Sequence, residues 1–312
     1  MNTKFAVDAS TSIPRSSFWR SLPYSKKLAP YILVSPFIIS FLIFFAYPVI
    51  NTVIMSFQEI LPGQVKYVGT ENYENLTNRQ FYRAMYNSAV YTVLTLLVLI
   101  PVPLIFAVLL NSKAMRFTNF FRSTLFIPAL TSVVVAGTIF RLIFGELPGS
   151  LMNEFLSLFN VAPANFKQSA PLAMFIMVIL ATWRWIGINI IYFLSGLQNI
   201  PHELYESAEI DGANAMDKFL KITLPLLKPV TIYVLTISIY GGFAMFTESY
   251  MLFAGNNSPK DIGLTIVGYI YKSGIQKNEL GFGSAIGITL LGIVLIINVI
   301  QLKFFGLFRK ED

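Results

Sequence analysis

The chain has 312 residues, of which 55% are hydrophobic and only 12% are charged. A soluble globular domain carries about 25% charged residues, so this composition excludes a disordered chain and an ordinary soluble enzyme. The chain has no cysteine and one histidine, His202. These counts argue against a disulfide framework, a zinc site and a histidine-based catalytic triad. The composition indicates a protein that crosses the membrane several times.

Six long apolar runs follow a polar N-terminal segment, residues 1–29. Each run exceeds the ~20 residues that a helix needs to cross ~30 Å of hydrocarbon. We therefore predict an all-α polytopic membrane protein, with a transmembrane domain over residues 30–306 and a cytoplasmic tail over residues 307–312. The predicted spans lie at about 30–56, 87–110, 121–144, 170–196, 226–254 and 281–306.

The charges between the runs predict the orientation in the membrane. The chain has a net charge of +7. The loops on the side of the two termini carry fourteen lysines and arginines, and those on the opposite side carry seven. Because positive residues gather on the cytoplasmic side, we expect both termini in the cytoplasm. The position of these cations between apolar runs favours this role over nucleic-acid binding.

The loop between the fourth and fifth spans, residues 200–225, has the pattern of two short helices joined by a turn. Pro201 favours a helix start and Gly212 permits a sharp turn. Apolar residues recur at helical spacing before the turn (Leu204, Tyr205 and Ala208) and after it (Phe219 and Ile222). An exposed apolar stripe with an acidic rim is typical of a docking surface.

This loop resembles the cytoplasmic loop of the membrane subunits of binding-protein-dependent ABC importers, which follows Glu-Ala-Ala-x2-Asp-Gly-Ala-x5-Phe-x2-Ile-x-Leu-Pro. The matching residues are Glu206, Ala208, Asp211, Gly212, Ala213, Phe219, Ile222, Leu224 and Pro225. Ser207, which is also small, stands at the first Ala. The upstream Ile-Pro-x-Glu-Leu-Tyr-Glu resembles the carbohydrate branch of these permeases, of the maltose or glycerol-phosphate type.

The resemblance implies that this loop is a coupling hairpin, which docks on a cytoplasmic ATPase subunit and moves the spans. The residues that it assigns to coupling are Glu203, Tyr205, Glu206, Ala208, Asp211, Gly212, Ala213, Phe219 and Pro225. It also implies a bacterial plasma membrane, a second permease subunit, two ATPase subunits, an extracellular solute-binding protein and a sugar substrate. No catalytic residue, cofactor or metal is expected in this chain, which has no G-x-x-x-x-G-K-[ST] motif.

Two charged residues inside the predicted spans are candidates for the substrate pathway. Arg184 lies near the middle of the fourth span and Glu248 lies in the fifth. Charged residues are costly in lipid, so both should face protein or water, and they could pair with each other. A structural ion pair without substrate contact is the alternative. Trp183 and Trp185 could stack on sugar rings or anchor the helix at the lipid.

The resemblance adds a prediction for the pathway, because sugar permeases of this type line their cavity with the helices on either side of the coupling loop. Trp185-Ile186-Gly187 and the aromatic segment Phe243 to Phe246 match these helices. The residues expected at the cavity are Trp183, Ile186, Gly187, Ser238, Gly242 and Met245. The asparagines often found in the second helix are missing, which leaves open both the substrate and which of the two permease subunits holds the main site.

Two other functions were weighed against an importer subunit. A stand-alone secondary transporter or channel would predict an inverted repeat and several intramembrane carboxylates, but only Glu248 lies inside a span. An intramembrane enzyme would need a paired acid, a Ser/His pair or a metal site, and none is visible. ATP-dependent uptake in proteoliposomes would separate the importer from the stand-alone transporter.

Overall fold

The computed structural model describes residues 27–61, 63–112, 115–145, 149–256 and 258–306. Most of the predicted N-terminal segment 1–29 and the whole predicted tail 307–312 lie outside these residues. The chain forms two units, one up to Ile54 and one from Met55 onward, which are described separately.

The first unit contains one long helix. It consists of α2 (Ala29–Phe41), the π-helical segment η2 (Leu42–Ala46) and α3 (Tyr47–Met55). The π-turn directly precedes Pro48, whose ring would press on the carbonyl of Phe44 in a regular helix. The helix is long and apolar enough to cross a membrane over Pro30–Met55, close to the predicted span at 30–56.

The second unit begins with a small β-hairpin, which the all-α prediction did not include. Strand β1 (Gln58–Leu61) pairs antiparallel with β2 (Gln64–Tyr67), so that Gln58 faces Tyr67. The short helix α4 (Glu71–Glu74) follows. The Nδ2 of Asn72 on α4 donates hydrogen bonds to the carbonyls of Ser56 (3.0 Å) and Gln58 (2.9 Å) and ties the two elements together.

The second candidate span, Arg79–Asn111, consists of α5 (Arg79–Leu99) and α6 (Pro101–Asn111), and it begins before the predicted run at 87–110. Pro103 has no N–H to donate to the carbonyl of Leu99, four residues earlier. The side-chain Nδ2 of Asn189 donates to that carbonyl instead, at 2.9 Å. A polar residue of another helix thus satisfies a backbone group that lipid could not.

The predicted third span, 121–144, is broken into two helices. α7 (Thr118–Leu130) and α8 (Val133–Ile143) meet at an angle of 93°, because Thr131 and Ser132 adopt extended backbone angles between them. The short helix α9 (Leu151–Ser157) leads to α10 (Ala170–Gln198), an unbroken helix of 29 residues. α10 contacts α5, α6 and α7, which makes it the central helix of this unit.

The predicted coupling loop is the segment that follows α10, and residues 200–225 are called the hairpin below. It contains α11 (Glu203–Ile210), α12 (Ala215–Lys218), the π-helical η3 (Phe219–Thr223) and most of α13 (Leu224–Leu226). After a bend of 64°, the chain continues in α14 (Lys228–Phe243).

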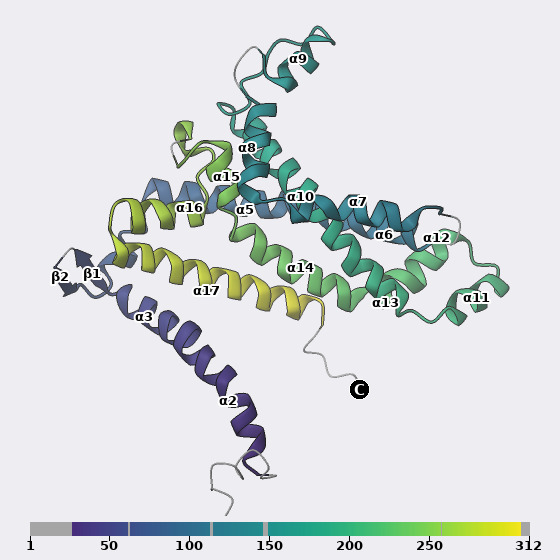
Figure 1. Ribbon diagram of the computed structural model, residues 1–312, viewed down its shortest axis with the longest axis horizontal. Helices are drawn as coiled ribbons and strands as arrows, with labels where there is room; N and C mark the ends of the chain where they lie inside the picture. The colour runs from purple at the N-terminus through teal and green to yellow at the C-terminus, as the bar shows by residue number, and fades with distance from the viewer. Residues whose placement is uncertain (1–26, 62, 113–114, 146–148, 257, 307–312) are drawn as a thin grey trace, which may run out of the picture. The chain divides into compact units, whose positions relative to one another are not determined.

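The predicted fifth run, 226–254, is interrupted after α14. The chain leaves the helix at residues 244–246 and resumes in α15 (Thr247–Leu252). The remaining elements are η4 (Pro259–Asp261), α16 (Ile266–Ile270), η5 (Tyr271–Gln276) and α17 (Leu280–Phe304). Figure 1 shows α17 running beside α14, which it contacts.

In the part of the chain that is described, four helices are long and apolar enough to cross a membrane, or up to six if each bent pair forms one span. The unit is therefore a mostly helical polytopic bundle. Two of its clusters of buried apolar side chains include α10: one joins it to α8 and α15, and a second joins it to α6 and α14. These two clusters position the residues considered next.

Candidate functional site

A cavity of about 450 Å³ lies between α5, α10 and the region where α14 ends. Tyr91 and Thr95 line it from α5, and Trp185 and Asn189 line it from α10. Four of the residues predicted for the substrate pathway also line it: Ser238, Gly242, Met245 and Glu248. The cavity therefore brings aromatic, hydroxyl, amide and carboxylate groups together inside an apolar bundle, a combination that suits a ligand rich in hydroxyl groups.

One face of α10 forms the wall of this cavity. Trp185, Ile188, Asn189 and Tyr192 occupy positions i, i+3, i+4 and i+7, so they share a face of the helix. Of these four, only Trp185 was considered from the sequence, as a ring that could stack on a sugar, and Ile188, Asn189 and Tyr192 were missed. The signal that could have found them was the polar Asn189 in mid-span, extended by helical spacing to its neighbours.

Arg184 and Glu248 form an ion pair beside the cavity. The Nη1 of Arg184 lies 2.9 Å from the Oε1 of Glu248, and the two side chains are only 11% and 13% exposed. The guanidinium carbon lies 5.3 Å from the centre of the Trp185 ring, within the range of a cation–π contact. Each charge of the pair compensates the other, and either one alone would be costly to bury. The N–H at Nε of Arg184 is the one buried donor of the pair that has no partner among the described residues.

The other predicted pathway residues on α10 lie elsewhere. Trp183 and Ile186 line a second cavity, on the side of α10 that faces the length of α5. Gly187 lies against α7, where a Cβ atom would collide with the backbone carbonyl of Leu125. Gly187 therefore permits close packing of two helices, while Trp183 and Ile186 do not share the 450 Å³ cavity with Ser238 and Gly242.

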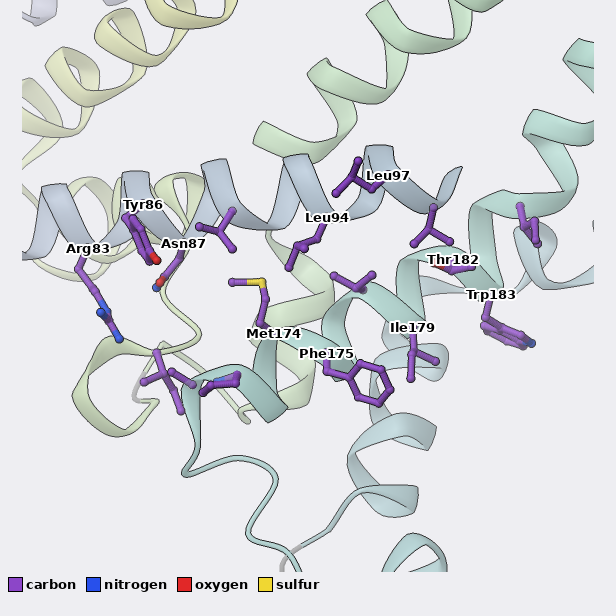
Figure 2. A pocket seen from close by; sticks show the side chains of 17 residues that line it. Arg83, Tyr86, Asn87, Leu94, Leu97, Met174, Phe175, Ile179, Thr182 and Trp183 are labelled. Atoms are coloured by element: carbon purple, nitrogen blue, oxygen red, sulfur yellow. The ribbon is translucent and has the colours of Figure 1, made fainter. Parts of the chain in front are cut away.

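The second cavity measures about 1050 Å³ and lies between α5 and α10. Figure 2 shows its side chains: Arg83, Tyr86 and Asn87 gather at one end, and Trp183 lies at the other. Most of the lining between these ends is aliphatic or aromatic. It offers few groups that could hydrogen-bond a sugar.

The turn of the hairpin has a helix C-cap geometry that depends on Gly212. Gly212 has a φ of +77°, a conformation that disfavours residues with a side chain. The N–H of Ala213 donates to the carbonyl of Ala208 at 2.8 Å, and the N–H of Gly212 donates to that of Glu209 at 3.0 Å. This is the Schellman arrangement, which ends α11 and reverses the chain.

Side-chain contacts hold the two arms of the hairpin together. The hydroxyl groups of Tyr205 and Thr223 lie 2.9 Å apart, and the Nζ of Lys218 lies 2.6 Å from the Oε1 of Glu209. Phe219 packs against the apolar cluster of α6, α10 and α14. A displacement of the hairpin would therefore be transmitted to the helices that flank the cavity.

The apolar surface of the hairpin differs from the predicted stripe. Tyr205, Ala208, Ala213 and Phe219 are partly buried against the rest of the unit. Of the predicted stripe, Leu204 (43%) is exposed, and the other large apolar side chains exposed on the hairpin are Ile210 (88%), Met216 (63%), Leu220 (51%) and Leu224 (39%). The remaining residues predicted for coupling are exposed: Glu203, Glu206, Asp211, Gly212 and Pro225.

An exposed ion pair stabilises the second arm. The Nζ of Lys221 lies 2.7 Å from the Oδ1 of Asp217, one helical turn away. This hydrogen bond and the positive charge of Lys221 hold the pKa of the Asp217 carboxyl below its ordinary value. Among the described residues, no group of three or more His, Cys, Asp or Glu side chains could hold a metal ion.

Comparison with known proteins identifies the family. Residues 77–305 match the family described as "Binding-protein-dependent transport system inner membrane component". The chain belongs to this family. It is therefore a permease subunit of an ABC importer and a multi-pass protein of the cell membrane, and not a stand-alone carrier or an intramembrane enzyme.

Individual relatives cover nearly the whole chain. It is 59% identical over 300 residues, 96% of each chain, to the "Arabinooligosaccharides transport system permease protein AraP" of Bacillus subtilis (strain 168). It is 31% identical over 243 residues, 77% of this chain and 81% of the relative, to the "Lactose transport system permease protein LacF" of Rhizobium radiobacter. A chain in the crystal structure of a bacterial alginate ABC transporter with its pentasaccharide-bound periplasmic protein has the same fold, with a TM-score of 0.80 at 23% identity over 94% of this chain and 98% of that one.

Proposed function

We propose that this permease subunit carries arabinose oligosaccharides into the cell. The observation that carries the proposal is the 59% identity, over almost the entire length, to a permease named for arabino-oligosaccharide transport. The 450 Å³ cavity supports it, because indole and phenol rings suit the C–H faces of sugars, while amide, hydroxyl and carboxylate groups suit their hydroxyls.

In this proposal the sugar passes along the Trp185–Tyr192 face of α10. Glu248, which lines the cavity, accepts hydrogen bonds from sugar hydroxyls, and its ion pair with Arg184 holds the carboxylate in place. Ser238, Gly242 and Met245 form the opposite wall. Trp183, Ile186 and Gly187 support the packing of α10 and do not touch the sugar in this arrangement.

The importer contains other subunits besides this permease. We propose that each bent helix pair forms one span, which yields six spans with both termini in the cytoplasm. A sister permease completes the pathway, an extracellular solute-binding protein delivers the sugar, and two cytoplasmic ATPase subunits hydrolyse ATP. The hairpin docks on one ATPase subunit through the exposed Leu204, Ile210 and Met216, and Phe219 passes the motion to the bundle.

Uptake by a defined strain tests the substrate. The chain would be produced with its sister permease, ATPase and binding protein in cells that lack other oligosaccharide importers. We expect labelled arabinotriose to accumulate, and accumulation to stop when ATP is depleted. Lactose, maltotriose and glycerol 3-phosphate serve as comparison substrates. If one of them were taken up as fast as arabinotriose, or if arabinotriose were excluded, the proposed substrate would be wrong.

Two variants test the coupling role of the hairpin. Gly212→Pro cannot adopt the positive φ of the turn, and Glu206→Lys reverses an exposed charge on α11. We expect both variants to remain in the membrane but to lose sugar uptake. Less ATPase subunit should co-purify with each of them. Glu71→Lys, an exposed charge reversal on α4, is the matched control. It should keep both the uptake and the co-purification of the ATPase subunit at the wild-type level. Uptake at the wild-type rate in both hairpin variants would contradict the docking role.

A further inference from the structure

The 1050 Å³ cavity between α5 and α10 is not used by the proposed sugar pathway. Its lining residues on α5 recur along one face from Arg83 through Val90, Leu94 and Leu97. Both helices are candidate membrane spans, so the groove runs through the depth of the hydrocarbon. Water does not fill apolar space of this kind, and an empty groove would forgo the dispersion contacts of both walls.

The dimensions of the groove favour a flexible chain as its occupant. From Arg83 to Val98, α5 rises by about 22 Å at 1.5 Å per residue. A volume of about 1050 Å³ over that length corresponds to a mean cross-section of roughly 50 Å², a circle about 8 Å across. An extended acyl chain is narrower than this and fits along the whole groove.

Arg83 supplies a charge at one end of this groove. It is the only charged residue in the lining, and Figure 2 shows its side chain extending from α5 at the end opposite Trp183. Its Nε is buried without a hydrogen-bond partner among the described residues, and no ion pair is found for it there. The neighbouring Asn87 is already used, because its Nδ2 donates to the carbonyls of Asp261 and Leu264.

We propose that the groove binds an anionic glycerophospholipid, with the phosphate at Arg83 and an acyl chain lying between α5 and α10 toward Trp183. Arginine donates in a fork that matches phosphate oxygens, and a basic pocket between membrane helices is a suitable headgroup site. The hydroxyl-bearing ring of Tyr86, 61% exposed, stands beside this end at the level expected of an interfacial aromatic residue. On the orientation proposed above, the lipid comes from the outer leaflet.

Photo-crosslinking of the assembled importer in nanodiscs tests this site. Phosphatidylglycerol and phosphatidylcholine would carry the same photoactivatable acyl chain, and labelled peptides would be mapped. We expect phosphatidylglycerol to label the segments 90–98 and 174–183 about fivefold more than phosphatidylcholine, the factor that corresponds to one arginine near an anionic headgroup. Arg83→Gln should lower this labelling to the phosphatidylcholine level.

Arg79→Gln is the matched control, because Arg79 is one turn earlier on α5, is exposed and does not line the groove. It should leave the preference intact. Leu94→Trp fills the groove from α5 and should lower labelling by both lipids in complexes that still assemble, so the test does not depend on the folding of one variant. Equal labelling by the two lipids would overturn the headgroup site. Absence of label in both segments would overturn the lipid groove itself.

Discussion

Two ion pairs in this chain differ in whether the charged residues need each other: one pair is buried between helices and the other is exposed to water. Arg184 and Glu248 are 64 residues apart in sequence and lie between helices, with side chains 11% and 13% exposed. Lys221 and Asp217 are four residues apart on the hairpin, and the Lys221 side chain is 76% exposed. The first pair needs a partner from a distant helix because lipid offers none, whereas water already satisfies both members of the second.

The same contrast extends to the backbone. Inside the bundle, the carbonyl of Leu99 that Pro103 leaves unpaired is satisfied by Asn189, from another helix. In the hairpin, the end of α11 is satisfied by the N–H groups of the next two residues, Gly212 and Ala213. These two groups of the bundle, the buried ion pair and the carbonyl of Leu99, therefore depend on tertiary packing, whereas the end of α11 depends on local turn chemistry. Four predictions test this difference.

The largest effect is expected from Glu248→Ala, which leaves Arg184 as a single buried charge. We expect a loss of about 3–5 kcal/mol, the usual cost of removing one partner of a buried pair, and loss of uptake. Thermal inactivation of the purified complex measures the stability. The double variant Arg184→Met/Glu248→Leu is the control: it should recover most of the stability, because no uncompensated charge remains, but should not recover uptake. If Glu248→Ala were as stable as the wild type, the pair would not be structural.

Asn189→Leu should cost about 1–3 kcal/mol, because the carbonyl of Leu99 would be left unpaired where α5 meets α6. Asn298→Leu is the matched control, since Asn298 donates to the carbonyl of Val294 within its own helix and should cost less. Thermal inactivation again provides the comparison. Pro103→Ala restores an N–H four residues after Leu99, so it should reduce the cost of Asn189→Leu. If Asn189→Leu cost the same stability with and without Pro103→Ala, the Asn189 side chain would not act through the carbonyl of Leu99.

Gly212→Ala should destabilise the hairpin by about 1–2 kcal/mol, because a residue with a Cβ atom disfavours the left-handed conformation. No atom lies within 4 Å of the position that the Cβ would occupy, so strain alone is tested. Faster hydrogen exchange at Ala213, whose N–H donates to Ala208, measures the effect. Gly212→Asn, which tolerates positive φ, should exchange nearly as slowly as the wild type. Equal exchange in the alanine variant would mean that the turn conformation is not needed.

The smallest effect is expected from Asp217→Asn, which removes an exposed ion pair. Because the pKa of Asp217 is lowered in the folded chain, its contribution to stability is present above its ordinary pKa of about 3.9 and is lost as the pH falls through the lowered value. Thermal unfolding of the wild type and Asp217→Asn should therefore differ slightly at neutral pH and converge in acid. If the wild type and Asp217→Asn still differed in thermal unfolding at a pH below the lowered pKa of Asp217, the effect would come from another group.

The hairpin could be predicted almost residue by residue, because its structure depends on neighbours. Pro201, Gly212 and the spacing of the apolar residues predict two helices and a turn, and the structure has α11, a turn at Gly212 and α12. The apolar face was predicted less well. Tyr205 and Phe219 turn toward Thr223 and the bundle, since a helical stripe can meet its own protein as easily as a partner.

The cavity could be predicted only in part. Arg184 and Glu248 were recognisable because charge is rare in a span, and a pairing between them was a possibility that the structure shows. Trp183 and Ile186 were expected beside Ser238 and Gly242, but they line the other cavity, because α10 has apolar residues on all sides and its rotation is not visible in the sequence.

Local chemistry explains why apolar length and one turn motif were enough to recognise a membrane permease subunit. The sharp bend between α7 and α8, the break before α15 and the face of α10 that forms the cavity wall became visible only in the tertiary structure. In lipid, an unpaired backbone group or charge must find its partner in another helix, and which helix that is depends on three-dimensional contacts that no local pattern records.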